Sequence, residues 1–367
     1  MSILTVFGTR PEAIKMAPVI RAAKEAGINT SVCVTAQHRG MLDQMLEVFG
    51  IKPDFDLDLM QENQSPTSVT ARVLEALPAV LGSVQPEWLL VQGDTTTAFA
   101  AAFAGYHHRV RVAHVEAGLR TDDKWQPFPE EMNRRLITAL ADLHFAPTRR
   151  AMEALIAEGV SPGRICMTGN TVVDALQEVL KRPASFADPR LTALSGRFVL
   201  LTAHRRENFG ERLEQICLAA RDLLHRFPDI ALVFPVHPNP HVAKIAERLL
   251  GGEARVVLTP PLSYPDFVHL MQAAALILSD SGGVQEEAPS VGTRVLILRE
   301  VTERPEAVES GWGKLVGTSR DKILEHATAW LEDGADTARL SRENPFGDGK
   351  ASARIIRGLQ QFSPTTI

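Results

Sequence analysis

The sequence predicts an α/β protein made of two doubly wound parallel sheets, and three observations lead to that prediction. Short runs of branched apolar residues alternate with longer segments of helical apolar spacing, which is the pattern of a parallel sheet covered on both faces. The alternation stops at residues 181–196, where prolines interrupt a stretch without periodicity, and then starts again. At 367 residues the chain also exceeds the usual size of one core. We therefore expect two Rossmann-like domains, 1–180 and 181–350, facing each other across a central cleft.

The expected strands are short apolar runs, and each ends in polar residues or a turn. In the first domain they are ILTVF (3–7), SVCVT (31–35), WLLVQ (88–92), RVAHV (111–115), LHFA (143–146) and RICMT (164–168). In the second they are FVLLT (198–202), ALVFP (231–235), VVL (256–258), ALILS (275–279) and RVLIL (294–298). Helical spacing is clearest at 11–26 and 96–106.

The composition argues against several classes of protein. A net charge of -5 does not suit a general nucleic-acid binder or a membrane-surface protein, which use a basic excess. No run reaches the roughly 18 apolar residues of a membrane span, and no basic segment precedes the first apolar run. Three cysteines, far apart and without CxxC spacing, indicate neither a disulfide framework nor a zinc knuckle. We expect a cytoplasmic protein.

Polar side chains gather where the expected strands end. Open α/β sheets bind ligands beyond the carboxyl ends of their strands, so these residues are the candidates for a site. The first domain contributes Arg10, Lys15, Gln37, His38, Asp94, Glu116, Arg120, Glu130, Glu131 and Arg134. The second contributes His204, Arg205, His237 and the segment SDSGGVQEEAPSVG, residues 279–292.

The segment SDSGGVQEEAPSVG has the composition of an anion site. Ser281, Gly282 and Gly283 precede an expected helix, and they leave no Cβ in the way of a phosphate that approaches its N–H groups. Glu287, one turn further, can accept hydrogen bonds from a ribose. The alternative is an ordinary glycine turn followed by acids that stabilise the helix dipole. The repeat of "RPEA" at Arg10 and at Arg304, once in each domain, favours a ligand shared between the domains.

Each chemical candidate also has a structural interpretation. Asp94 could be the N-cap of the helix that starts at 95–97. Glu116 follows a buried strand directly, where an unpaired carboxylate is costly. His204 could be a hydrogen-bonded polar residue without a role in catalysis, although two arginines beside it favour a function. The combined set indicates acid/base chemistry on a molecule with a phosphorylated end.

Cofactor and metal fingerprints are missing. No G-x-G-x-x-G follows a strand and no G-x-x-x-x-G-K-[ST] occurs, so neither a nicotinamide cofactor nor a Walker nucleotide site is expected. His237 and His241 have the spacing of a metal pair, but Pro238 and Pro240 do not allow an ordinary helix there. We expect no cofactor and no metal.

The motifs taken together resemble the non-hydrolysing UDP-N-acetylglucosamine 2-epimerases. The matching segments, in order, are FGTRPEAIKMAPVI, TAQHRGMLDQ, GDTTT, HVEAGLRT, PFPEEMNR, TGNTVVDAL, TAHRRENFG, PVHPNP, DSGGVQEEAPSVG and TERPEAVESG. The resemblance implies a GT-B arrangement, a homodimer, and a C-terminal segment, 351–367, that returns to the first domain. It also implies reversible epimerisation of UDP-GlcNAc to UDP-ManNAc through a 2-acetamidoglucal intermediate, for polysaccharide biosynthesis.

The resemblance also assigns residues. It implies acid/base roles for Asp94, Glu116 and Glu130, with His204 near the leaving diphosphate. UDP contacts are implied for Arg10, Lys15, His237, Ser281, Gly282, Gly283 and Glu287, with Arg134 and Arg304 completing the charge. Activation by a second UDP-GlcNAc is implied at Gln37, His38 and Arg205, although Gly40 and Asn63 differ from many relatives. A GT-B glycosyltransferase with a UDP-sugar donor is the main alternative, and the acidic trio favours the epimerase over it. A hydrolysing relative or a sensor of nucleotide sugars are further alternatives.

Overall fold

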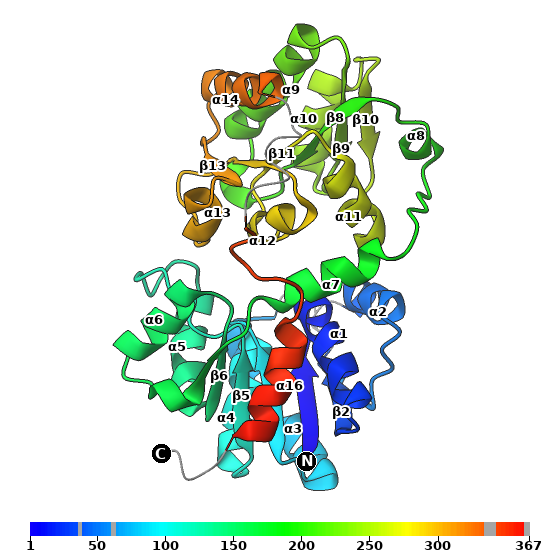
Figure 1. The fold of residues 1–367 in the computed structure, drawn as a ribbon. Helices are drawn as coiled ribbons and strands as arrows, with labels where there is room; N and C mark the ends of the chain where they lie inside the picture. The colour runs from blue at the N-terminus through cyan, green and yellow to red at the C-terminus, as the bar shows by residue number, and fades with distance from the viewer. Residues whose placement is uncertain (36–38, 60–63, 334–342, 363–367) are drawn as a thin grey trace. The chain divides into compact units, whose positions relative to one another are not determined.

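The computed structural model describes residues 1–35, 39–59, 64–333 and 343–362. The chain divides into two compact units (Figure 1). Unit 1 comprises Met1–Ala175 and Gly347–Ile367, and unit 2 comprises Leu176–Phe346. This division falls inside helix α7 (Thr171–Leu180), whereas the sequence-based boundary stands at the end of that helix.

Unit 1 contains a seven-stranded parallel sheet in the order β3-β2-β1-β4-β5-β6-β7. Its strands are β1 (Ser2–Phe7), β2 (Asn29–Val34), β3 (Phe55–Asp56), β4 (Trp88–Gln92), β5 (Arg111–Val115), β6 (Leu143–Ala146) and β7 (Ile165–Met167). Strands β1 and β4 are almost entirely buried, which explains why their sequences are continuous apolar runs.

Helices cover both faces of this sheet (Figure 1). They are α1 (Arg10–Glu25), α2 (Arg39–Val48), α3 (Pro66–Val84), α4 (Thr96–His107), α5 (Glu130–Leu140), α6 (Arg149–Ala157) and part of α7. The alanine-rich α4 packs between α3 and α5, and its alanines are buried in the core with Val73 and Leu77. Short side chains allow α4 to lie close to β4 and β5.

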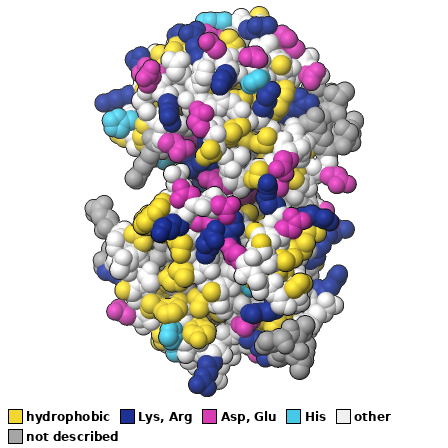
Figure 2. All heavy atoms as spheres, turned by 90° about the vertical axis from the view of Figure 1, so that its left-hand side faces the viewer, with side chains coloured by type: hydrophobic (Ala, Val, Ile, Leu, Met, Phe, Trp, Pro, Cys, Tyr) yellow, Lys and Arg dark blue, Asp and Glu magenta, His cyan; other side chains and the backbone are white. Residues whose placement is uncertain are grey.

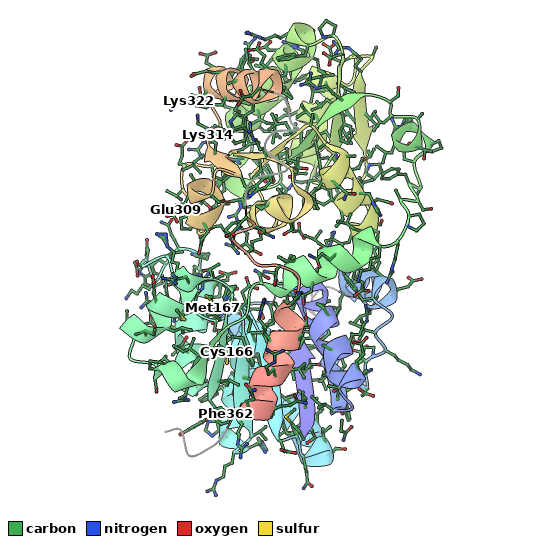
Figure 3. All side chains as sticks on the ribbon, in the orientation of Figure 1. Cys166, Met167, Glu309, Lys314, Lys322 and Phe362 are labelled. Atoms are coloured by element: carbon green, nitrogen blue, oxygen red, sulfur yellow. The ribbon has the colours of Figure 1, made fainter. Side chains whose placement is uncertain are left out.

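Helix α16 (Ala351–Gln361) packs on α1 and β7 of unit 1. Gly358 permits the close approach, because a Cβ there would meet Phe145 Cε1 at 2.8 Å and Cys166 Sγ at 3.2 Å. Figure 3 shows Cys166 and Phe362 beside this helix. Phe362 then packs edge-on against Trp88, with ring centroids 5.1 Å apart. The C-terminal segment thus completes the core of unit 1.

Unit 2 contains a six-stranded parallel sheet in the order β10-β9-β8-β11-β12-β13. Its strands are β8 (Arg197–Thr202), β9 (Ile230–Pro235), β10 (Val256–Thr259), β11 (Leu276–Ser279), β12 (Val295–Ile297) and β13 (Gly313–Leu315). The helices are α8 (Pro189–Thr192), α9 (Glu211–Arg226), α10 (Pro240–Leu250), α11 (Tyr264–Ala273), α12 (Gly282–Val291), α13 (Pro305–Glu309) and α14 (Arg320–Glu332). The order repeats that of unit 1, so β8 corresponds to β1 and β11 corresponds to β4.

The predicted fold class is confirmed, and every predicted strand occurs with its ends shifted by two residues or fewer. Two strands were not predicted. β3 has only two residues, and β13 reads GKL, which lacks a branched apolar run. The interruption at 181–196 also contains the short helix α8. Within the described part of the chain, every helix is too short or too polar to cross a membrane.

Candidate functional site

Glu116 follows β5 directly and lies at the centre of a buried polar group in unit 1. Its φ is 63°, in the left-handed region that residues other than glycine rarely adopt. Its carboxylate accepts hydrogen bonds from Lys15 Nζ, which lies 2.7 Å from both oxygens, and from Gln92 Nε2. Only 5% of the Glu116 side chain is exposed. A strained backbone held by a buried ion pair indicates a functional position.

Asp94 lies in the turn between β4 and α4, and its carboxylate is paired. Arg134 Nη2 lies 2.8 Å from Asp94 Oδ2, and Asn133 Nδ2 donates to the Asp94 carbonyl oxygen at 2.9 Å. Arg134 is 4% exposed, whereas the Asp94 side chain is 28% exposed. The turn therefore presents a carboxylate to solvent from a rigid support.

The interpretation of Asp94 as the N-cap of α4 is wrong. The N-cap is Thr95, whose hydroxyl accepts a hydrogen bond from Ala98 N at 3.0 Å. Asp94 precedes the cap and leaves the helix start to its neighbour. Its carboxylate is thus available for another role.

His114 supports the same turn from inside the sheet. Its Nε2 lies 2.7 Å from the carbonyl oxygen of Gly93, and the residue is fully buried in β5. Burial lowers the pKa of His114 to about 4, and the nearby charges of Arg120 and Arg134 act in the same direction. A neutral imidazole therefore donates to Gly93 at physiological pH.

Glu12 connects the turn after β1 with the turn after β4. Its Oε2 accepts from Gly8 N at 3.1 Å and from Thr9 N at 2.8 Å, and its Oε1 accepts from Thr95 Oγ1 at 2.7 Å. The side chain is 1% exposed, and burial raises the pKa of Glu12 in spite of these hydrogen bonds. The N–H groups at the entry to α1 are thus already bound to a carboxylate of the protein.

Two further candidates of unit 1 start helices. Arg10 is the first residue of α1 and Glu130 is the first residue of α5, and both are half-buried. Each helix follows a parallel strand, so both residues lie at the carboxyl edge of the sheet. The structure thus brings six predicted residues to this edge: Arg10, Lys15, Asp94, Glu116, Glu130 and Arg134.

The start of helix α12 in unit 2 has the features of an anion site. Ser281 is the N-cap, and among the described residues no side chain caps this helix. A Cβ added at Gly282 would lie 3.5 Å from the guanidinium carbon of Arg304 and 3.7 Å from Arg205 Nη2. Two guanidinium groups therefore stand beside N–H groups that the helix leaves unbonded. This arrangement can hold a phosphate or diphosphate.

Buried acids position the groups around α12. Arg304 Nε donates to Glu286 Oε1 at 2.8 Å, and Glu286 is 1% exposed. Glu287 accepts a hydrogen bond from Tyr264 OH at 3.1 Å and is also buried. Glu286 thus orients Arg304, whereas Glu287 is held by a phenol.

His204 and His237 lie at the ends of β8 and β9. Their rings stack with centroids 6.2 Å apart and an angle of 19°. Burial, followed by the charge of His204, lowers the pKa of His237 below its ordinary value. The carboxyl edge of unit 2 therefore holds seven predicted residues: His204, His237, Ser281, Gly282, Gly283, Glu287 and Arg304.

Known proteins of one family share both the motifs and the fold of this chain. A family model described as UDP-N-acetylglucosamine 2-epimerase matches residues 21–360. The chain belongs to this family. It is 48% identical over 375 residues to the UDP-N-acetylglucosamine 2-epimerase of Yersinia pestis, covering 100% of both chains. It is 48% identical over 371 residues to that of Escherichia coli strain K12, covering 98% of each chain.

Solved structures of the epimerase family agree with the fold. The UDP-GlcNAc 2-epimerase from Neisseria meningitidis, bound to UDP-GlcNAc, matches with a TM-score of 0.89 and 44% identity. The match covers 99% of this chain and 100% of that chain. The predicted family and enzyme class, an isomerase, are confirmed.

Some of the predicted residues are not among those that the structure describes, and some residues that support the site were not predicted from the sequence. Gln37 and His38 lie outside the described residues, so Arg205 is the one residue predicted for activator binding that the structure describes. Sequence reasoning missed Glu12, His114 and Asp280. Asp280 could have been predicted from the sequence, because an acid directly after a buried strand needs a partner. Among the described residues, His, Cys, Asp and Glu form no group of three or more that could hold a metal ion.

Proposed function

We propose that this epimerase interconverts UDP-GlcNAc and UDP-ManNAc without hydrolysing either. The observation that carries the proposal is the group of buried and half-buried carboxylates at the carboxyl edge of unit 1, with Glu116 at its centre. The diphosphate-type site at α12 supports it, as does the relative from Neisseria meningitidis that was solved with UDP-GlcNAc.

We propose that the bond from C1 to UDP breaks first, or nearly so, and that the proton at C2 is then removed. C2 has no adjacent carbonyl, so direct removal of its proton gives an unstabilised carbanion. When the C1–O bond breaks, UDP takes the electron pair and the ring gains oxocarbenium character, which acidifies the C2 hydrogen. A carboxylate then accepts that proton, and the electrons of the C2–H bond form the C1=C2 bond of 2-acetamidoglucal. Addition of UDP to C1, with a proton delivered to the opposite face of C2, completes the inversion.

Unit 1 is proposed to handle the proton and the cationic ring. Asp94, Glu116 and Glu130 supply carboxylates for both faces of C2 and for stabilising positive charge on the ring. Lys15 and Arg134 place a positive charge beside Glu116 and Asp94 through the pairs described above. Arg10 adds a positive charge at the same edge for the diphosphate.

Unit 2 is proposed to bind UDP. The N–H groups of Gly282 and Gly283, with Arg304 and Ser281, take the diphosphate, which carries the charge that develops when the C1–O bond breaks. Glu287 accepts a hydrogen bond from the ribose, and His204 and His237 lie toward the departing phosphate.

A deuterium experiment tests the proposal. The enzyme is incubated with UDP-GlcNAc in deuterated water and C2 is followed by NMR. We expect solvent deuterium at C2 together with UDP-ManNAc. A product without deuterium, or deuterium without UDP-ManNAc, contradicts the mechanism, and free ManNAc with UDP indicates a hydrolysing enzyme. A glycosyltransferase exchanges no proton at C2, so the same experiment excludes that alternative.

We also propose activation by a second molecule of UDP-GlcNAc, with Arg205 among its contacts. The test starts the reaction from pure UDP-ManNAc. A lag that added UDP-GlcNAc removes supports activation. Hyperbolic kinetics without a lag contradicts it.

A homodimer is proposed on the apolar surface of unit 1. Trp125, Phe128, Met132 and Leu136 are each more than 35% exposed, although all are large and hydrophobic. Figure 2 shows hydrophobic side chains gathered on the face of unit 1 that this view presents. Exposed apolar patches of this kind are typical of protein interfaces. Sedimentation equilibrium is expected to give twice the chain mass, and a monomer contradicts the proposal.

A further inference from the structure

Asp280 is a buried acid that the proposed reaction does not use. It follows β11 and precedes the start of α12, and it is 0% exposed. Its carboxylate accepts hydrogen bonds from His204 N at 3.0 Å, Arg205 N at 2.9 Å and Asn208 Nδ2 at 3.0 Å. Burial opposes ionisation, but the hydrogen bonds and the charge of His204 hold the pKa of Asp280 below its ordinary value. The group is therefore an anion inside the protein.

The same carboxylate reaches the ring of His204. His204 Nδ1 lies 3.2 Å from Asp280 Oδ1, and the His204 side chain is 45% exposed. An ionised carboxylate only accepts hydrogen bonds, so Nδ1 must carry a proton toward it. A neutral imidazole with its proton on Nδ1 presents the lone pair of Nε2, and a second proton there makes Nε2 a donor. The ring is thus fixed in both tautomer and direction.

Asp280 also orients the neighbouring arginine. Arg205 Nε donates to the carbonyl oxygen of Asp280 at 3.0 Å, and Arg205 Nη2 reaches the space above Gly282. One residue therefore connects the imidazole of His204, the guanidinium of Arg205 and the entry to helix α12.

We propose that Asp280 is a positioning residue that fixes the Nδ1–H tautomer of His204 and aims its Nε2 at the departing diphosphate. The kinetic part of this inference rests on the proposed function. The structural part does not, because it concerns the location of a proton on His204 in the free enzyme.

NMR of the free enzyme tests the structural part. The wild-type protein is labelled with 15N-histidine, and the His204→Gln variant identifies the signals of residue 204 by difference. At alkaline pH, where imidazoles carry a single proton, we expect the Nδ1 of His204 to carry it. A dominant Nε2–H tautomer overturns the proposal. This measurement needs only the wild-type fold and one exposed substitution, so it decides even if variants of Asp280 fail to fold.

Kinetics tests the functional part. Asp280→Asn replaces an acceptor with an amide that favours the other tautomer, and we expect kcat to fall about tenfold or more. Asn208→Ala is the matched control, because it removes a different hydrogen bond to the same carboxylate, and its kcat should stay at the wild-type value. Asp280→Asn is also expected to add nothing to the loss caused by His204→Gln.

The outcomes separate the two parts. Equal losses in Asp280→Asn and Asn208→Ala indicate a merely structural role and contradict the proposal, as does an independent loss in the double variant. If His204→Gln retains full activity, the proposed role of His204 in the reaction is wrong, whereas the tautomer result still decides the positioning by Asp280.

Discussion

The two units have the same strand order but treat their helix starts in opposite ways. In unit 1, Thr95 caps α4 with its own hydroxyl. In unit 2, α12 follows the corresponding strand, and among the described residues its start has no side-chain cap. Two arginines stand beside it instead. The same strand order therefore places a helix start capped by the protein in unit 1, and a helix start that is left for an anion in unit 2.

In each unit a buried carboxylate connects two corresponding turns by hydrogen bonds. The residue that carries this carboxylate differs in its position: it lies in a helix in unit 1 and in a turn in unit 2. Glu12 reaches from α1 to the turns after β1 and β4. Asp280 reaches from the turn after β11 to the turn after β8. In unit 1 the carboxylate of Glu12 already accepts the N–H groups of Gly8 and Thr9 at the entry to α1. The comparison suggests proton chemistry for unit 1 and phosphate binding for unit 2.

The largest expected effect is on turnover, and it concerns unit 1. Asp94→Asn and Glu116→Gln remove the charged carboxylates but keep the shape of the side chains. We expect kcat to fall about 100-fold or more, since general acid/base groups contribute that much, while UDP affinity stays close to wild type. Steady-state kinetics and calorimetric titration with UDP measure the two quantities. Turnover at the wild-type rate removes that carboxylate from the chemistry.

The buried histidines of unit 1 should also make stability depend on pH. Burial lowers the pKa of His114 to about 4 and that of His144 to about 3. The unfolded chain then binds the protons more tightly, so stability is retained above about pH 6.5 and is lost as the pH falls toward 4. Between pH 7 and pH 5, we expect wild type to lose about 2 kcal/mol more unfolding free energy than His114→Gln. Urea denaturation at the two pH values measures this.

The exposed His241 in unit 2 provides the control for this pH effect. His241→Gln should lose stability in parallel with wild type, because the substitution removes no buried imidazole. If His241→Gln and His114→Gln respond alike to acid, the buried histidines are not the cause.

The open helix start can be tested by a substitution that should not harm the fold. Gly282→Ala places its Cβ 3.5 Å from Arg304, an ordinary contact, and alanine loses less backbone entropy than glycine on folding. We therefore expect an unchanged or higher melting temperature together with about tenfold weaker UDP binding, because the methyl group obstructs the phosphate. Gly82→Ala, in α3 with open space around it, is the matched control. Equal UDP affinity in both variants is incompatible with a diphosphate at α12.

The smallest expected effect is on the unfolding free energy, when the residue before each of the two helices is replaced by alanine. Thr95→Ala should cost at least about 1 kcal/mol of unfolding free energy, because Ala98 N loses its partner and the buried Glu12 loses a donor. Ser281→Ala should cost less than about half of that, because Ser281 makes no side-chain cap. Thermal unfolding of both variants without nucleotide measures the difference. Similar costs indicate that the two helix starts are capped alike.

The sequence predicted the positions of the strands, because buried parallel strands require continuous apolar runs. It also led us to expect a site at Glu116 and at the glycines that start α12, since neither an acid nor two glycines is needed there for packing, and this stays a prediction. It could not decide whether Asp94 caps α4 or belongs to a site, because aspartate is a favoured N-cap residue. The links made by Glu12 and Asp280 were not predictable, because their partners are brought together only by the sheet order.

The decisive measurement is a crystal structure of this enzyme with UDP-GlcNAc, because it shows whether unit 2 binds the diphosphate while unit 1 faces C2 of the sugar. We expect the β-phosphate at the start of α12, in contact with the N–H groups of Gly282 and Gly283. We also expect C2 of the sugar to lie within hydrogen-bonding reach of Asp94 or Glu116. A diphosphate at the entry to α1, with Glu12 displaced from Gly8 and Thr9, contradicts it.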